Sequence, residues 1–216
     1  MTSHPSPSKK SAWRENVEAI VIALILALFI RTFIVQAFKI PSGSMLPTLQ
    51  IGDHILVNKF IYGIKIPFSG KVLVPVKDPQ PNDIIVFKYP ENPKLDYIKR
   101  VVGTAGQTVE IRDKVVLIDG VAFDDKYGVH SDVNILSAAQ GPRDNYGPVT
   151  VPPGKLFVMG DNRDNSYDGR FWGFVDLQAV RGKAFLIYWS WDVRADLFSL
   201  DRFRSVRWGR IGDLVH

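Results

Sequence analysis

The chain has 216 residues, enough for one or two compact domains, and 46% of them are apolar, which is sufficient for a hydrophobic core. The 27 Lys and Arg residues exceed the 22 Asp and Glu residues by a formal net charge of +5, and this mild, dispersed excess does not indicate a nucleic acid partner. Because the sequence contains no cysteine, disulfides, thiolate metal sites and a cysteine nucleophile are all excluded.

The amino-terminal part of the chain begins polar and then becomes strongly apolar. Ser, Pro and Lys dominate the first residues, which predict a disordered tail over residues 1–16. The uncharged run Ala19–Ile30 would span only about 18 Å as a helix, whereas a helix that continues to Phe38 would span about 30 Å, the thickness of a bilayer core. We therefore predict a transmembrane anchor over residues 17–38.

The charges before the apolar run predict its orientation. Lys9, Lys10 and Arg14 precede the run, and basic residues stay on the cytoplasmic side, so residues 39–216 would form an exported domain. Two alternatives stay open. One is a cleavable secretory signal, for which Val35-Gln36-Ala37 resembles a cleavage site, and the other is a buried helix of a soluble protein.

The rest of the chain has the pattern of short strands. Apolar runs separated by Gly, Pro, Asp and Asn recur from Ile55 to Trp189, and Arg112-Asp113-Lys114 between two of them predicts a hairpin. The polar, Gly- and Pro-containing segment 123–149 predicts a loosely ordered insertion, either loops or a small cap. The predicted fold class is mainly β: a compact, largely antiparallel barrel or sandwich with this cap, behind one amino-terminal transmembrane helix.

A constrained, hydroxyl-rich stretch follows the apolar run directly. Pro41 and Pro47 restrict φ at their own positions, and Gly43 permits a tight backbone between Ser42 and Ser44. Such a backbone can hold Ser44 at a fixed angle, as a nucleophile requires. A plain turn rich in Pro, Gly and Ser is the alternative.

A serine nucleophile needs a base, and the sequence offers two kinds. His54 lies beside Asp53, but neighbouring residues of a strand point to opposite faces, which argues against a Ser-His-Asp arrangement. Lys99 lies within an apolar strand, where burial would lower its pKa and make it a neutral base. The alternative is a lysine on the wet face of a half-buried strand.

The stretch Gly160–Gly173 is dense in polar side chains although apolar strands flank it. Part of it fits the start of an EF-hand calcium loop, but Val175 stands where the bidentate carboxylate is needed. A plain surface turn is a second alternative. A third is a buried hydrogen-bond network that supports a site.

Four blocks, in this order behind the apolar run, resemble the bacterial type I signal peptidases, a family with a serine–lysine dyad. They are Pro41–Leu49, Pro81–Phe87, Asp96–Gly103 and Ser166 with the six residues before it. Gly169 and Asn82 depart from the family pattern, since many relatives have serine and glycine there. The resemblance covers the anchor and most of the body, but none of residues 123–149.

The resemblance implies a role for each candidate site residue. Ser44 would be the nucleophile and Lys99 the general base, while the Ser42 hydroxyl and the Ser44 backbone N–H would hold the oxyanion. Ser166 would orient the lysine amine. Two further sets follow: a supporting network of Asp161, Arg163, Asp168 and Arg170, and pockets for small substrate side chains lined by Phe38, Ile40, Val86 and Ile98.

The resemblance also implies an activity and a location. The chain would be a membrane-anchored serine endopeptidase that removes signal peptides from exported preproteins, cutting after small residues in an Ala-x-Ala pattern. It would need no cofactor and no metal, and its partners would be signal peptides and the lipid bilayer, not nucleic acid. It would be a single-pass protein of the bacterial inner membrane with a periplasmic catalytic domain. The rival functions are a self-cleaving serine–lysine regulator of the SOS-repressor kind and a catalytically silent, membrane-tethered β-domain.

Overall fold

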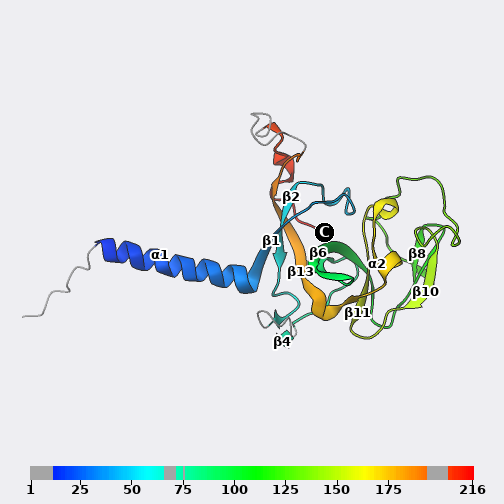
Figure 1. Cartoon of the computed structure of the whole chain (residues 1–216), viewed down its shortest axis with the longest axis horizontal. Coiled ribbons are helices and arrows are strands. Elements are labelled where there is room, and N and C mark those ends of the chain that lie inside the picture. Colours follow the sequence, from blue (N-terminus) through cyan, green and yellow to red (C-terminus); the bar gives the residue numbers. More distant parts are fainter. Residues whose placement is uncertain (1–11, 66–71, 75, 194–203) are drawn as a thin grey trace, which may run out of the picture.

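The computed structural model describes residues 12–65, 72–74, 76–193 and 204–216. One long helix, α1, extends away from a body made of β-sheets (Figure 1). Most of the tail predicted over residues 1–16 lies outside the described residues.

The amino-terminal helix ends earlier than predicted. α1 spans Ala12–Phe29, a π-helical turn η1 spans Ile30–Ile34, and the chain then becomes extended as β1, Val35–Lys39. The prediction of one helix up to residue 38 is therefore wrong at its end, because the backbone of β1 pairs antiparallel with β2, Asp53–Asn58, along its whole length. Among the described residues, no helix combines the length and the apolar character needed to cross a membrane.

The largest sheet has seven strands in the order β1-β2-β13-β5-β6-β11-β12, and its neighbouring strands run antiparallel. The predicted mainly antiparallel β body is thus confirmed. Within the described part of the chain, however, β1 and β12 pair with no further strand, so this sheet is open and is not a closed barrel. Its other strands are β13 (Val180–Ser190), β5 (Ile84–Tyr89), β6 (Asn92–Thr104), β11 (Lys155–Met159) and β12 (Val175–Asp176).

A second sheet, in the order β10-β7-β8-β9, lies at the end of the body away from α1 (Figure 1). It contains the predicted hairpin, whose turn residues Asp113 and Lys114 have φ of 45° and 73°, the left-handed values that a two-residue hairpin turn requires. The strands are β7 (Thr108–Arg112), β8 (Val115–Ile118), β9 (Val121–Ala122) and β10 (Tyr146–Thr150), and a separate pair joins β3 (Ile64–Lys65) to β4 (Val72–Val74).

Three buried apolar clusters lie against these sheets. β6 contributes to all of them, through Ile98 to the first, Val101 to the second and Val102 to the third. The first cluster also contains Met45, which has no exposed surface and comes from the loop after β1. The loop that carries Ser44 is therefore packed into the core of the body, and it is not a plain surface turn.

Short helical turns occupy the polar stretch that precedes β12. They are η2 (Arg163–Asn165) and α2 (Gly169–Trp172), and strands β11 and β12 flank them where an EF-hand would have long helices. Two further turns, η3 (Leu177–Ala179) and η4 (Trp208–Arg210), lie before and after β13.

The segment predicted as a loose insertion, residues 123–149, is irregular until it reaches β10. Side-chain bonds nevertheless tie it to the body. Asp144 is fully buried and accepts a bond of 2.7 Å from Arg143, and the Lys114 Nζ atom lies 3.4 Å from its carboxylate. Lys114 also donates a bond of 2.7 Å to Asp164, so the insertion is joined to the polar stretch around η2.

Candidate active site

The side chains of Ser44 and Lys99 meet inside the body. Ser44 lies in the loop after β1, and Lys99 lies on β6 opposite Ile85 of β5. The Lys99 Nζ and Ser44 Oγ atoms are 2.5 Å apart and hydrogen-bonded. Both residues are buried, with exposed fractions of 4% for Lys99 and 9% for Ser44. The predicted nucleophile and the predicted base are thus direct neighbours, although 55 positions separate them in the sequence.

Burial changes the acidity of the Lys99 amine. Its removal from water lowers the pKa of Lys99 to about 8, while the carboxylates of Asp168 and Asp161 oppose this shift and the Arg170 guanidinium adds to it. An amine with this pKa is neutral in a substantial fraction of molecules at mildly alkaline pH, so it can accept a proton from a hydroxyl.

Asp168 and Arg170 form a buried ion pair beside the lysine. Arg170 Nε and Nη2 each donate a bond of 2.8 Å to the two carboxylate oxygens of Asp168, and the Gly160 N–H donates another of 3.0 Å. Burial by itself raises the pKa of Asp168, but the bonds from Arg170 outweigh it and hold this pKa below its usual value. Asp168 is therefore a permanent negative charge near Lys99.

Asp161 forms a second buried ion pair, with Arg100. Arg100 was not among the site residues predicted from the sequence. Arg100 Nε and Nη2 donate bonds of 2.8 and 2.7 Å to the Asp161 carboxylate, and neither side chain is exposed. Arg100 Nη1 donates a further bond of 2.8 Å to the backbone oxygen of Asn82. The sequence does carry one signal for Arg100. It is a charged residue beside the apolar residues of β6, and a buried charge needs a partner of opposite charge.

Arg163 pairs with the insertion. It is fully buried and donates two side-chain bonds to Asp125, one of them 2.6 Å long from Nη2. Its Nε atom donates a bond of 3.1 Å to the backbone oxygen of Gly160. The sequence did not identify Asp125, because nothing in its irregular surroundings distinguishes it from other polar loop residues.

Asn162 connects the polar stretch directly to the nucleophile's loop, and the sequence missed this role as well. Its backbone N–H donates a bond of 3.1 Å to the backbone oxygen of Ser44, and its side chain donates one of 3.1 Å to the backbone oxygen of Gly43. This close approach requires glycine at position 160. A Cβ atom there would clash, because it would lie 2.4 Å from the backbone oxygen of Ser44 and 2.3 Å from Ser166 Oγ.

The other two predicted hydroxyls, those of Ser166 and Ser42, differ in their exposure. Ser166 Oγ is buried and lies near Asp168, where its hydroxyl helps to lower the pKa of that carboxyl, but it forms no hydrogen bond of normal geometry. The expected bond to the Lys99 amine is therefore not formed in this structure. Ser42 is exposed to solvent in the loop before Ser44. The orienting role of Ser166 and the oxyanion role of Ser42 stay predictions.

Comparison with known proteins connects this geometry to a family. The family model described as signal peptidase, peptidase S26, matches residues 13–189. The chain belongs to this signal peptidase family. Signal peptidase I of Pseudomonas fluorescens is 40% identical over 198 residues, which cover 78% of this chain and 69% of that protein. Probable signal peptidase I-1 of Synechocystis sp. is 35% identical over 222 residues, which cover 100% of this chain and 95% of that protein.

Membership in the signal peptidase family makes the chain a hydrolase and confirms the resemblance drawn from the four sequence blocks. A solved structure of a signal peptidase I from Enterococcus faecalis is also similar, at 35% identity. The match covers 50% of this chain and 97% of the solved chain, with a TM-score of 0.40.

The four predicted pocket residues of this chain belong to one apolar cluster or pack against it. Ile40 and Val86 are buried in the first apolar cluster, and Phe38 and Ile98 pack against it. Val86 and Ile98 are directly opposite each other on β5 and β6. The same apolar cluster contains Met45, the residue after Ser44, so the cluster adjoins the loop of the nucleophile. The substrate-binding role of the four residues stays a prediction.

The alternative base, His54, has other contacts. Its ring packs edge-on against Tyr188 and Trp191, with ring centroids 5.9 and 5.6 Å apart, and burial lowers its pKa. The Ser44 hydroxyl is bonded to Lys99 instead, so the geometry favours the lysine over a Ser-His-Asp arrangement.

The carboxylates of the polar stretch are engaged with cations of the protein. Asp161, Asp164 and Asp168 are bound to Arg100, Lys114 and Arg170 respectively. No cluster of three or more His, Asp or Glu side chains suited to a metal ion occurs in the described ranges. The buried-network interpretation of this stretch therefore agrees with the structure.

Proposed function

We propose that this member of the signal peptidase family is a serine endopeptidase that removes signal peptides from exported preproteins through an acyl-enzyme on Ser44. The observation that carries the proposal is the 2.5 Å contact between Lys99 Nζ and Ser44 Oγ, with both groups buried. Two further facts support it: the pKa of Lys99 lowered to about 8, and membership in a family of peptidases.

All proton transfers of the reaction would pass through one amine, that of Lys99. Neutral Lys99 accepts the proton of the Ser44 hydroxyl while Ser44 Oγ attacks the carbonyl carbon of the cleaved bond. The protonated lysine then gives this proton to the leaving amine. A water molecule then gives a proton to Lys99 and attacks the acyl carbon, and Lys99 returns that proton to Ser44 Oγ as the ester bond breaks. These steps need no metal and no organic cofactor.

The oxyanion would be held by the Ser42 hydroxyl and the backbone N–H of Ser44. A donor of this kind commonly contributes about 3–4 kcal/mol to the lowering of the barrier. Ser42 is exposed before substrate arrives, and a bound peptide would cover it. The Ser166 hydroxyl, which is buried and has no partner among the described residues, would be free to bond to the lysine amine when Lys99 changes its protonation state.

Specificity would come from the apolar surface next to the dyad. Phe38, Ile40, Val86 and Ile98 present side chains that are already packed against the core, so only shallow spaces are left for a substrate. Small residues at the first and third positions before the cut, as in Ala-x-Ala, would fit such spaces. The substrate backbone would add as an extended strand beside the site.

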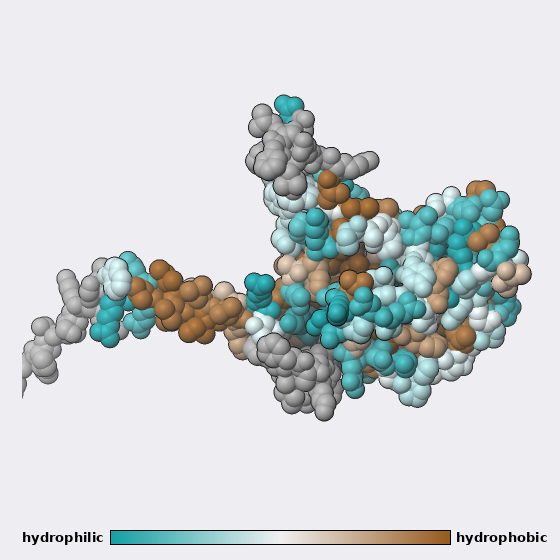
Figure 2. All heavy atoms as spheres, in the orientation of Figure 1, coloured by the Kyte–Doolittle hydropathy of each residue, from teal (hydrophilic) through white to brown (hydrophobic). Residues whose placement is uncertain are grey.

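The lipid bilayer is the second proposed partner. α1 is apolar along most of its length and stands clear of the body (Figure 2). Its apolar side chains are about half exposed, for example Leu24 at 58% and Leu28 at 62%. We expect α1 to anchor the chain at the inner membrane of a bacterium, with the catalytic body on the periplasmic side. The single-pass arrangement and the Ala-x-Ala specificity are parts of this proposal.

The test is cleavage of an Ala-x-Ala preprotein by the detergent-solubilised full chain. Ser44→Ala and Lys99→Ala should each abolish cleavage while the protein stays folded, since each removes one of the two groups that exchange the proton. Lys155→Ala on β11, a 38% exposed lysine side chain in a surface ion pair, is the matched control and should cleave normally. Near-normal turnover by either dyad variant would refute the mechanism, and an inactive wild type would refute the function.

A further inference from the structure

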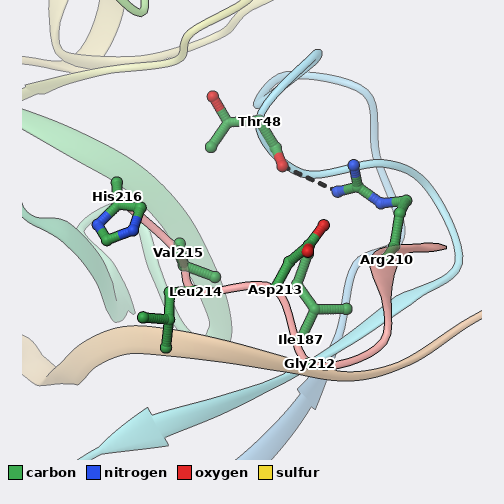
Figure 3. A pocket seen from close by; sticks show the side chains of 8 residues that line it. All are labelled: Thr48, Ile187, Arg210, Gly212, Asp213, Leu214, Val215 and His216. Atoms are coloured by element: carbon green, nitrogen blue, oxygen red, sulfur yellow. Dashed lines mark hydrogen bonds between the residues drawn. The ribbon is translucent and has the colours of Figure 1, made fainter.

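Thr48, which follows Ser44 by four positions in the same loop, is held at its hydroxyl and at its backbone oxygen. Its hydroxyl donates a bond of 2.6 Å to Asp161 Oδ2, and its backbone oxygen accepts one of 2.9 Å from Arg210 Nη2 (Figure 3). Leu49 and Met45 close the loop with a backbone bond of 2.9 Å. These bonds hold the loop in addition to the contact between Asn162 and Ser44.

Arg210 is a rigid partner because a buried carboxylate holds it. Its Nη2 and Nε atoms lie 2.6 and 3.2 Å from the two oxygens of Asp53, which is fully buried. Asp53 in turn accepts a bond of 2.6 Å from the Ser190 hydroxyl on β13. The guanidinium therefore reaches Thr48 from a position that the core of the body sets.

The second partner of Thr48 is connected to the same part of the chain. Arg100, which pairs with Asp161, also donates a bond of 3.0 Å from Nη2 to the backbone oxygen of His216. At one end of the 210–216 segment Arg210 bonds to Thr48 directly, and at the other end His216 contacts Arg100, the partner of Asp161.

The backbone of the 210–216 segment is fastened to β13. Three backbone hydrogen bonds join them: Gly212 N–H to the Ile187 oxygen (2.8 Å), Ile187 N–H to the Asp213 oxygen (2.9 Å) and Val215 N–H to the Phe185 oxygen (3.0 Å). Val215 is 7% exposed and belongs to the first apolar cluster. The segment therefore moves only if β13 or the core moves.

Thr48 does not owe its position to close packing on every side. A cavity of about 440 Å³ opens between Thr48 and the segment, lined also by Ile187 and Arg210 (Figure 3). Met45 and Leu49 pack into the core, but the open space at this face of the loop leaves the position of Thr48 itself to its hydrogen bonds.

We infer that the 210–216 segment is a positioning element for the nucleophile: by holding Thr48 through Arg210 and through the Arg100–Asp161 pair, it sets the distance between Ser44 and Lys99. The inference rests on the proposed function. None of these residues touches the reacting atoms, so they are positioning residues. A displacement of reacting groups by about 1 Å costs on the order of 10²-fold in rate.

Two substitutions test the inference in the preprotein assay with the full chain. Thr48→Val keeps the branched shape and removes the hydroxyl, and Arg210→Gln removes the guanidinium. Each should lower kcat by about tenfold to a hundredfold, since each lets the loop move, and should leave KM nearly unchanged because other residues form the substrate pockets. The double variant should be little slower than the slower single variant, because both changes act on Thr48.

Conservative variants separate positioning from general destabilisation. Thr48→Ser restores the hydroxyl and should restore most of kcat, while Arg210→Lys keeps the charge beside Asp53 but cannot bond to both Asp53 and Thr48, so its kcat should be intermediate. If Arg210→Gln does not fold, Thr48→Ser and Arg210→Lys still decide whether the segment acts by positioning Thr48. The matched controls are Thr150→Val and Arg112→Gln, both at exposed hydrogen bonds of the second sheet, and both should keep the wild-type kcat.

Two outcomes would overturn the inference: a wild-type kcat in folded Thr48→Val and Arg210→Gln, or an effect on KM alone. Thermal unfolding of every variant shows which ones are folded at the assay temperature. If the wild type is active and these variants are too, only this inference fails. If the wild type does not cleave the preprotein at all, the proposed function fails with it.

Discussion

Lys99 is the residue whose protonation should set the pH dependence of this enzyme. A general base must be neutral, and burial lowers the pKa of Lys99 from about 10.5 to about 8. The neutral fraction rises as pH increases through this value. We expect kcat/KM to rise about tenfold per pH unit below pH 8 and to level off above it.

The measurement is the pH profile of kcat/KM for a preprotein or peptide substrate, which reports the pKa of the free enzyme. Ser44→Ala supplies the baseline at each pH. A profile that is flat between about pH 6 and 9, with chemistry as the slow step, would contradict a lysine base.

Among the elements, the polar stretch between β11 and β12 holds the site together. Asp161 binds Arg100 on β6, Arg163 binds Asp125 in the insertion, and Asp168 binds Arg170 within the stretch. Charges this deeply buried are tolerated only as pairs, because each one alone has lost its hydration. The stretch is therefore joined to two other parts of the chain, β6 and the insertion, and removing one member of either pair should destabilise the fold.

Asp161→Asn tests this element. The change leaves the Arg100 guanidinium without a countercharge at a position with no exposed surface, so we expect a loss of about 3–5 kcal/mol in the free energy of unfolding. The measurement is equilibrium unfolding in urea.

The control for this loss is Glu110→Gln. Glu110 pairs with Arg112 on the second sheet, where the arginine side chain is 67% exposed, so this change should scarcely alter stability. Equal losses in the free energy of unfolding for the two substitutions would mean that burial does not determine how much the Arg100–Asp161 pair contributes to stability.

For the whole molecule, the exposed apolar surface of α1 predicts binding to lipid. Leu24 and Leu28 are 58% and 62% exposed. Replacing both with lysine should weaken binding of the full chain to phosphatidylethanolamine–phosphatidylglycerol vesicles more than tenfold, since burying one such side chain contributes about 1.5–3 kcal/mol.

Cosedimentation with the vesicles measures this binding. The control is Val133→Lys in the insertion, where the side chain is 94% exposed, and it should bind like the wild type. Equal binding of the double lysine variant and the wild type would show that α1 is not the lipid contact.

Sequence patterns predicted much of the local structure, and they selected two residues whose side chains meet in the folded chain. The period-two runs, the hairpin turn at Asp113 and Lys114, and the candidates Ser44 and Lys99 all depend on short stretches of sequence. The end of α1 was predicted wrongly, because the extended conformation of Val35–Lys39 comes from pairing with β2, which hydropathy along the chain does not report.

The partners of the site were visible only in the folded molecule. Arg100, Asn162, Asp125, Thr48 and Arg210 come from different loops and strands, and each functions through a contact with a residue distant in sequence. Nothing in the neighbourhood of any one of them along the chain indicates which residue it will meet.

By itself the sequence determined that the protein is a β-rich hydrolase of the signal peptidase family with a serine and a lysine as its reactive candidates, because residue types and their local spacing carry that information. The tertiary structure alone decided that Lys99 is buried away from water and that its amine lies 2.5 Å from the Ser44 hydroxyl. It also decided which buried ion pairs surround these two groups. Desolvation and ion pairing depend on what surrounds a group in space, and only folding brings those surroundings together.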